Sequence, residues 1–282
     1  MISLTKSYLK KIVTSPLFCI CLIAFIFFSS LYNTQCLKLA LTNRQETVQE
    51  TESTEQDQQV VFSVVVEAVP NTPMPVPAQM TAEYLFADVA ASAYPALCAA
   101  LFAAQFLFDE RKYRFLQNFP GIGRYPWKLV GAHSAVLVLE SAGITLAYLV
   151  CGLFSGLIVF GGRIAAGSWL GILKIFAMTF VLLLGVSGIM MFVSQIVKKQ
   201  IVIIAAALLL LNYGLILELS PLEQMYEKVE EFAVTYLPIL NSAVIASDVS
   251  APEFLRSVGQ SLLYFAVPVL AHYGLLRKKG IT

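Results

Sequence analysis

The sequence predicts an all-α integral membrane protein that forms a single membrane domain of six transmembrane helices. Of its 282 residues, 58% are hydrophobic and 13% are charged, whereas a soluble domain carries about 25% charged residues. The apolar residues gather in runs long enough to cross a bilayer as helices. The charged residues fall between these runs, so the net charge of +1 gives no indication of a nucleic-acid partner. The six spans are predicted at residues 17–38, 84–108, 129–160, 169–197, 201–219 and 258–276.

A basic amphipathic segment, Met1–Ser15, precedes the first span. Three lysines in it are interspersed with apolar residues that recur at helical spacing, namely Leu4, Tyr8, Leu9 and Ile12. This pattern predicts an interfacial helix on the inner side of the membrane. A cleaved signal peptide is the alternative for the apolar run that follows. That run, Leu17–Leu37, has 21 residues and no A-x-A pattern after it, so a retained span is predicted.

The first connection, residues 42–83, is acidic and is predicted to be an external loop. Seven acidic residues in it oppose a single cation, Arg44. Its first half is rich in Gln, Glu and Thr, a composition typical of mobile segments. The β-branched run Val60–Val69 then predicts a short strand. Four prolines between Pro70 and Pro77 lead back to the membrane in an extended conformation.

The later spans are joined by shorter connections. The run 129–160 is too long for one straight span perpendicular to the membrane, so the helix either tilts or ends near Gly152–Gly156. A turn at Gly161–Arg163 separates it from the fourth span. After the fifth span, the apolar residues of Leu222–Tyr236 recur at helical spacing among four glutamates. This pattern predicts an amphipathic helix that lies on the outer face or re-enters the membrane there.

Two pairs of glycines are predicted to let helices approach closely. Gly152 and Gly156 form a G-x-x-x-G pair in the third span, and Gly185 and Gly188 lie three residues apart in the fourth. Small residues at such spacing are typical of helix–helix contacts in membranes.

The cations are distributed unequally across the six-span arrangement. Thirteen of the nineteen lysines and arginines fall in the N-terminus, the connection between the second and third spans, the pair Lys198–Lys199 and the C-terminus. Cytoplasmic loops of membrane proteins are enriched in Lys and Arg. Both termini are therefore predicted to be cytoplasmic, in a multi-pass protein of the cytoplasmic membrane.

The connection Asp109–Lys128 combines charge with large apolar side chains. It carries five cations against two carboxylates, and four large apolar residues, Phe115, Leu116, Phe119 and Trp127. A plain cytoplasmic connector accounts for the cations. It does not account for the aromatic residues, which indicate that another protein binds this connection.

At this connection the sequence resembles the membrane subunit of an ABC-2 type exporter. In that family an acidic residue closes the second span and a short amphipathic helix follows. A proline, a basic residue and a lysine then lead into the third span. Here Glu110, the stretch Arg111–Phe119, Pro120, Arg124 and Lys128 occupy those positions. The resemblance implies that the ATPase-coupling residues are Glu110, Arg111, Tyr113, Phe115, Leu116, Phe119, Pro120 and Arg124.

The resemblance extends to both ends of the chain. The motif LKKIVTSP at Leu9–Pro16 is similar to the basic elbow helix that precedes the first span in the family. The amphipathic segment and Tyr236–Pro238 match the outer segment before the sixth span. The family therefore implies an elbow helix, a cytoplasmic coupling helix and an outer interfacial helix within one six-span domain.

The resemblance also implies a division of labour between subunits. This chain would be a non-catalytic permease without a cofactor of its own, and two separate ABC ATPase subunits would bind ATP and Mg. A second permease subunit, identical or homologous, would complete a path across the lipid membrane for an amphiphilic peptide such as an antimicrobial peptide, a lipid or a drug. ATP-driven closure would move the Arg111–Phe119 helix and rearrange spans one, two and five. The residues agree, because the sequence has no G-x-x-x-x-G-K-[ST] phosphate-binding loop.

Glu140 is the candidate residue for the substrate path. It lies eleven residues past Leu129, about 17 Å along a helix, and is either part of that path or a buried structural partner of another polar group. His133 and His272 are each expected to be packed residues with one hydrogen bond. An intramembrane enzyme that uses Glu140 and His133 is the weakest alternative, because about 10 Å along the helix is too far for direct acid–base pairing. No cysteine or histidine spacing predicts a metal site.

A non-transporting membrane protein is the alternative function. An immunity or sensor protein would bind a cationic peptide through the acidic loop 42–83 and the helix after Pro221, and it would need no ATPase. The two functions differ in the segment that matters: Asp109–Lys128 for an exporter, and the outer acidic segments for a sensor.

Overall fold

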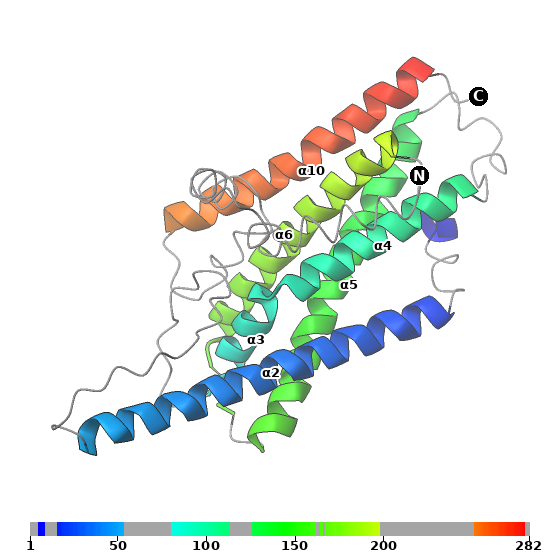
Figure 1. Cartoon of the computed structure of the whole chain (residues 1–282). Helices are drawn as coiled ribbons and strands as arrows, with labels where there is room; N and C mark the ends of the chain where they lie inside the picture. Colours follow the sequence, from blue (N-terminus) through cyan, green and yellow to red (C-terminus); the bar gives the residue numbers. More distant parts are fainter. Residues whose placement is uncertain are drawn as a thin grey trace, which may run out of the picture.

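The structure, a computed structural model, describes residues 5–8, 16–53, 80–112, 126–161, 164–165, 167–197 and 251–279. Apart from one isolated β-bridge, the regular elements in these ranges are helices (Figure 1). Four helices are long and apolar enough to cross a membrane, and there are five such spans if α3 and α4 count as one. The predicted all-α class is confirmed for these ranges. The helices are α2 (Pro16–Ser53), α3 (Ala82–Ala91), α4 (Ala93–Lys112), α5 (Pro126–Phe160), α6 (Trp169–Ile196) and α10 (Ala251–Lys279).

Several predicted elements fall outside the described residues. Only residues 5–8 of the N-terminal interfacial helix are described, and they are helical. The Val60–Val69 strand, the fifth span at 201–219 and the amphipathic helix at 222–236 are not within the described ranges. These elements stay predictions.

α2 is longer than the span predicted for it. Its apolar part, Ile20–Leu39, suits a membrane crossing, but the helix continues to Ser53. The expectation of a mobile loop from Thr42 onward is therefore wrong for residues 42–53. No glycine or proline occurs between Pro16 and Pro70, and Gln, Glu and Leu favour helix. The sequence therefore contains no residue that stops the helix where the apolar run ends.

The second span is a bent pair of helices, and the prediction of one helix over 84–108 is wrong. α3 and α4 differ in direction by 53°. Pro95 explains the break, because it has no backbone N–H to donate to Ala91 and its ring crowds the carbonyl four residues back. Ser92 lies at the corner in an extended conformation, and its Oγ donates to the carbonyl oxygen of Val89 at 2.7 Å.

α5 is one continuous helix of 35 residues and does not end near Gly152–Gly156. Its C-terminus is capped from α2, where Lys38 Nζ donates to the carbonyl oxygen of Val159 at 3.0 Å. A cation at the last carbonyls of a helix interacts favourably with the helix dipole. A turn follows at Gly161, whose φ of 61° is a left-handed conformation that glycine adopts without strain.

α3 and α6 begin side by side. Thr81 and Ala165, just before the two helices, form a parallel β-bridge. Thr81 caps α3, and Ser168 caps α6 by accepting from the backbone N–H of Gly171. The carboxylate of Glu83 also accepts from the Ser168 N–H at 3.3 Å. One acidic side chain therefore lies at the positive ends of two helix dipoles, where a negative charge is stabilising.

α6 is the central helix of the described bundle. Of its most apolar stretch, 67% is buried, compared with 17% for α10. It packs against α3, α4, α5 and α10. Its contact with α10 is close at Gly185 and Gly188: a Cβ atom built at Gly188 would lie 2.6 Å from the carbonyl oxygen of Tyr264. The predicted role of this glycine pair is confirmed.

Glycine and alanine allow two further close contacts. A Cβ atom at Gly156 of α5 would lie 2.5 Å from Leu85 Cδ1 of α3. On α4 a row of alanines faces the interior and lets its backbone approach α5 and α6. These buried alanines are Ala96, Ala99, Ala100, Ala103 and Ala104.

The contacts define two ends of the bundle (Figure 1). At one end, the ring of Tyr8 lies 5.3 Å from that of Phe106 on α4 and 5.4 Å from that of His133 on α5, and His133 stacks on His272 of α10. At the other end lie the Lys38 cap and the paired starts of α3 and α6. Residues 5–8, the C-terminal part of α10 and the ends of α4 and α5 that flank residues 113–125 therefore gather at the same end.

We predict that Gly188→Ala destabilises the protein by about 1–3 kcal/mol, because the added methyl group overpacks a helix contact. The midpoint of thermal unfolding in detergent measures the effect. Gly143→Ala on α5 is the matched control, since a Cβ there meets no atom within 4 Å. A control variant as unstable as Gly188→Ala would contradict the close α6–α10 contact.

Candidate functional site

Three buried polar residues lie along one side of α5 and contact different parts of the bundle. His133, Glu140 and Tyr148 follow one another at intervals of seven and eight residues, close to two helical turns each. Their side chains are 1%, 7% and 0% exposed. We call these three residues the polar face of α5. Because α5 contacts each of the other five named helices, this face is the candidate functional site.

Glu140 lies near the middle of α5 and is bonded to α6. Ser187 Oγ donates to Glu140 Oε2 at 3.4 Å. The other carboxyl oxygen, Oε1, has no hydrogen-bond partner among the described residues, and neither does the neighbouring hydroxyl of Ser141. Ionisable residues inside a membrane are rare and usually functional. Among the described residues, Oε1 of Glu140 is therefore left to bind a further group.

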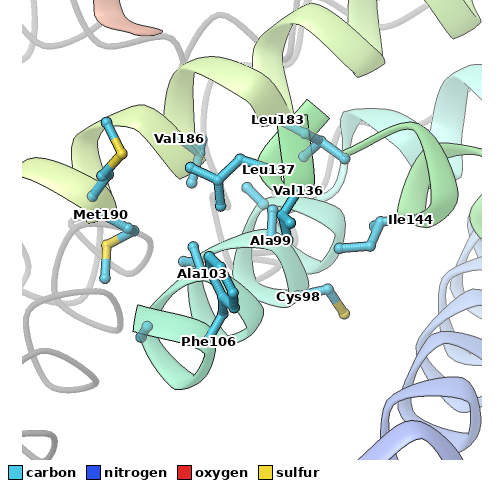
Figure 2. Close-up of a cluster of buried hydrophobic side chains, with 14 of the residues drawn as sticks. Cys98, Ala99, Ala103, Phe106, Val136, Leu137, Ile144, Leu183, Val186 and Met190 are labelled. Carbon is cyan, nitrogen blue, oxygen red and sulfur yellow. The ribbon is translucent and has the colours of Figure 1, made fainter. Parts of the chain in front are cut away.

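The surroundings of Glu140 are apolar. Leu137 and Ile144, one turn before and after it on α5, are 0% and 4% exposed. Figure 2 shows these residues among side chains of α4 and α6 such as Ala103 and Val186. Within this part of the bundle, Ser187 on α6 donates a hydrogen bond to the carboxyl group. The sequence leaves the partner of Glu140 open; the structure identifies it as Ser187.

Tyr148 joins three helices through its hydroxyl group. It shares a hydrogen bond with Ser29 Oγ of α2 at 3.1 Å and with Cys98 Sγ of α4 at 3.4 Å. Tyr148 was not among the residues predicted from the sequence. The available signal was its place on the same helical face as His133 and Glu140, two turns further along.

His133 bonds to two partners from the two ends of the chain. Its Nδ1 lies 3.3 Å from Nε2 of His272, and its Nε2 lies 3.2 Å from the hydroxyl of Tyr8. The expectation that each histidine has a single hydrogen bond is wrong for His133. The contact between the two histidines was not predicted from the sequence.

The predicted ATPase-coupling residues are described only in part. Glu110 and Arg111 lie in the last turn of α4, which ends at Lys112. Tyr113, Phe115, Leu116, Phe119, Pro120 and Arg124 fall outside the described residues. α5 then begins at Pro126, with Trp127 54% exposed and the ammonium group of Lys128 5.6 Å from the centre of its ring.

Among the described residues, the members of the polar face bond to different helices. Glu140 bonds to α6, whereas His133 bonds to α10 and to residues 5–8, so the two residues of the enzyme alternative face different partners. Among the described residues, no group of three or more His, Cys, Asp or Glu side chains is placed to hold a metal ion.

A comparison of the sequence with protein-family models found no match, and a comparison with curated proteins found none either.

We predict an energetic coupling between Glu140 and Ser187 of about 0.5–1.5 kcal/mol, the usual range for a buried hydrogen bond. A double-mutant cycle with Glu140→Ala and Ser187→Ala, read out by unfolding in mixed micelles, measures this coupling. The control pairs Glu140→Ala with Thr179→Ala, because the Thr179 hydroxyl donates to the Ile175 carbonyl of its own helix. Additive effects in the Glu140–Ser187 cycle would contradict the contact.

Proposed function

We propose that this chain is the membrane-spanning permease subunit of an ATP-driven exporter of the ABC-2 type. In this proposal two separate ATPase subunits bind ATP and Mg. A second permease subunit, identical or homologous, completes a path for an amphiphilic peptide, lipid or drug. The chain itself performs no catalysis.

The observation that carries the proposal is the basic, aromatic connection Asp109–Lys128. It joins α5, which carries the polar face, to α4, which contacts that face through Cys98. A force applied between the end of α4 at Lys112 and the start of α5 at Pro126 acts directly on those helices. A partner that pushes on this connection would therefore reach the interior of the bundle without passing through another element.

In this proposal Glu140 is a polar residue that lines the transport path. Its free oxygen Oε1 and the adjacent Ser141 hydroxyl are suited to bind a polar part of an amphiphilic substrate. The surrounding leucine, isoleucine and alanine side chains are suited to its apolar part.

A second candidate function is an immunity or sensor protein that binds a cationic peptide. The observation that favours it is the continuation of α2 to Ser53, because this extension carries Glu46, Glu50 and Glu52 away from the apolar part of the helix. A cationic peptide would bind there by charge attraction, with no need for an ATPase.

The experiment that tests the proposal replaces Phe115 and Leu116 by aspartate. We expect the double variant to reach the membrane but to lose co-purification of the ATPase subunit, because charged residues cannot fill an apolar cleft. The amount of ATPase retained after detergent extraction, measured by quantitative mass spectrometry, gives the result.

The control replaces the same residues conservatively, as Phe115→Leu and Leu116→Met, and is expected to retain the ATPase. If the wild-type protein co-purifies with no ATPase, the exporter proposal is wrong. Loss of cationic-peptide binding on replacing Glu46, Glu50 and Glu52 by glutamine would then support the sensor function.

A further inference from the structure

The chain contains two histidines, and they meet inside the bundle. His133 of α5 and His272 of α10 are 1% and 3% exposed. Their rings are stacked with centroids 5.5 Å apart, and Nδ1 of His133 lies 3.3 Å from Nε2 of His272. Histidine is the side chain that changes its charge near neutral pH. A contact between two imidazole nitrogens is therefore sensitive to the number of protons on the pair.

The number of protons determines whether the contact persists. With both rings neutral, one facing nitrogen donates and the other accepts. With one added proton, His133 donates from both nitrogens, to His272 and to the Tyr8 hydroxyl, so both of these hydrogen bonds are retained. With a second added proton, both facing nitrogens carry hydrogen and both rings carry a positive charge. The pair then has no acceptor between the rings and is repulsive.

The described residues bring a hydroxyl group and an aromatic ring against the pair. Residues 5–8 contribute the Tyr8 hydroxyl, and α4 contributes the edge of the Phe106 ring, at a centroid distance of 5.7 Å from His133. On α10, Tyr273 follows His272 directly. α6 has a single charged residue, Lys174, in its second turn, at the opposite end of the bundle. Except for Glu140 in the middle of α5, the other charged residues lie at the ends of these elements: Lys6, Asp109, Glu110, Arg111, Lys112, Lys128, Glu253, Arg256, Arg277, Lys278 and Lys279.

Pro268 divides α10 into two parts that contact different helices. Before Pro268, the backbone at Ser261 and Tyr264 lies directly on Gly185 and Gly188 of α6. Pro268 is inside the helix and lacks the N–H that would bond to the carbonyl of Tyr264, so the helix is weakest there. His272 comes four residues later and ties the remaining part to α5. Val269 and Leu276 also pack against the core in this segment, and the histidine contact adds a polar tie to α5.

We propose that His133 and His272 bind protons as one site, which holds the C-terminal part of α10 against α5 with up to one added proton. A second proton breaks the contact and lets residues 269–279 swing away about Pro268. The histidine pair lies at the end of the bundle where α4 and α5 flank the connection Asp109–Lys128. The inference does not rest on the exporter proposal, because it requires no ATPase and no substrate.

The first test follows the rings themselves. The protein is labelled with 15N-histidine, reconstituted in lipid bilayers and studied by solid-state NMR across the pH range. Because both histidines are in the pair, every signal belongs to the site. We expect a through-hydrogen-bond 15N–15N coupling in the singly protonated state, and two protonation steps separated by about one pH unit or more, as for interacting groups. In His272→Gln, His133 is expected to take up its proton in a single step.

The second test follows the movement of α10. Spin labels at Trp127→Cys and Arg277→Cys, in a background with the five native cysteines replaced by alanine, report the distance between the start of α5 and the end of α10. We expect a narrow distribution at about pH 8 and a longer, broader one at about pH 5, where histidine becomes charged. The control pair, Trp127→Cys and Leu255→Cys, reports the distance between the start of α5 and the start of α10. This distance should not change with pH.

Three outcomes would overturn the proposal. The rings could titrate independently, with His133 unaffected by His272→Gln. The Trp127–Arg277 distance could stay unchanged while the NMR spectra show both rings charged. The control distance could change as much as the test distance, which would indicate general unfolding. The wild-type titrations decide each of these points even if the His272→Gln variant fails to fold.

Discussion

Buried polar side chains in an apolar bundle need hydrogen-bond partners, and this need constrains where each helix can lie. Lipid offers no hydrogen bonds, so a polar side chain within the membrane must find its partner in the protein. The polar face of α5 meets this need from several directions: Tyr148 bonds to α2 and α4, Glu140 to α6, and His133 to α10 and residues 5–8. A rotation of α5 by one residue would break all of these contacts together.

These hydrogen bonds set the rotation of the helices, and small residues set their spacing. A hydrogen bond between transmembrane helices contributes about 0.6 kcal/mol on average, which is too little to hold a bundle together alone. The close contacts come from the alanines of α4, from Gly156 of α5 and from Gly188 of α6, where backbones approach without side chains between them. The hydrogen bonds and the small residues are complementary, because the helices can pack tightly only in the rotation that the polar pairs specify.

The sequence was sufficient for the elements that depend on local patterns. The predicted fourth span, 169–197, agrees with α6 because Ser168 caps the start of an uninterrupted apolar run. The role of Gly188 followed from its size alone. The bend at Pro95 was missed because a proline inside an apolar run also occurs in straight spans. The extension of α2 was missed because the apolar stretch ends at Leu39. The residues that follow are polar, but they still favour a helix.

The contacts between helices were the part that sequence patterns could not supply. The six-span arrangement placed His133 early in one span and His272 late in another, on the same side of the membrane, but no periodicity shows that α5 and α10 are neighbours. The same holds for Ser187 as the partner of Glu140. Both contacts depend on helix adjacency, which arises from the packing of small residues across elements distant in the chain.

The central claim is that the connection between α4 and α5 faces the cytoplasm, where a partner can act on the polar face of α5. Labelling of single cysteines with a membrane-impermeant maleimide in intact cells tests it most directly, with Thr42→Cys on the extension of α2 and Trp127→Cys at the start of α5 in a cysteine-free background. The account predicts that Thr42→Cys reacts in intact cells and that Trp127→Cys reacts only after the membrane is permeabilised. Reaction of Trp127→Cys in intact cells would contradict it.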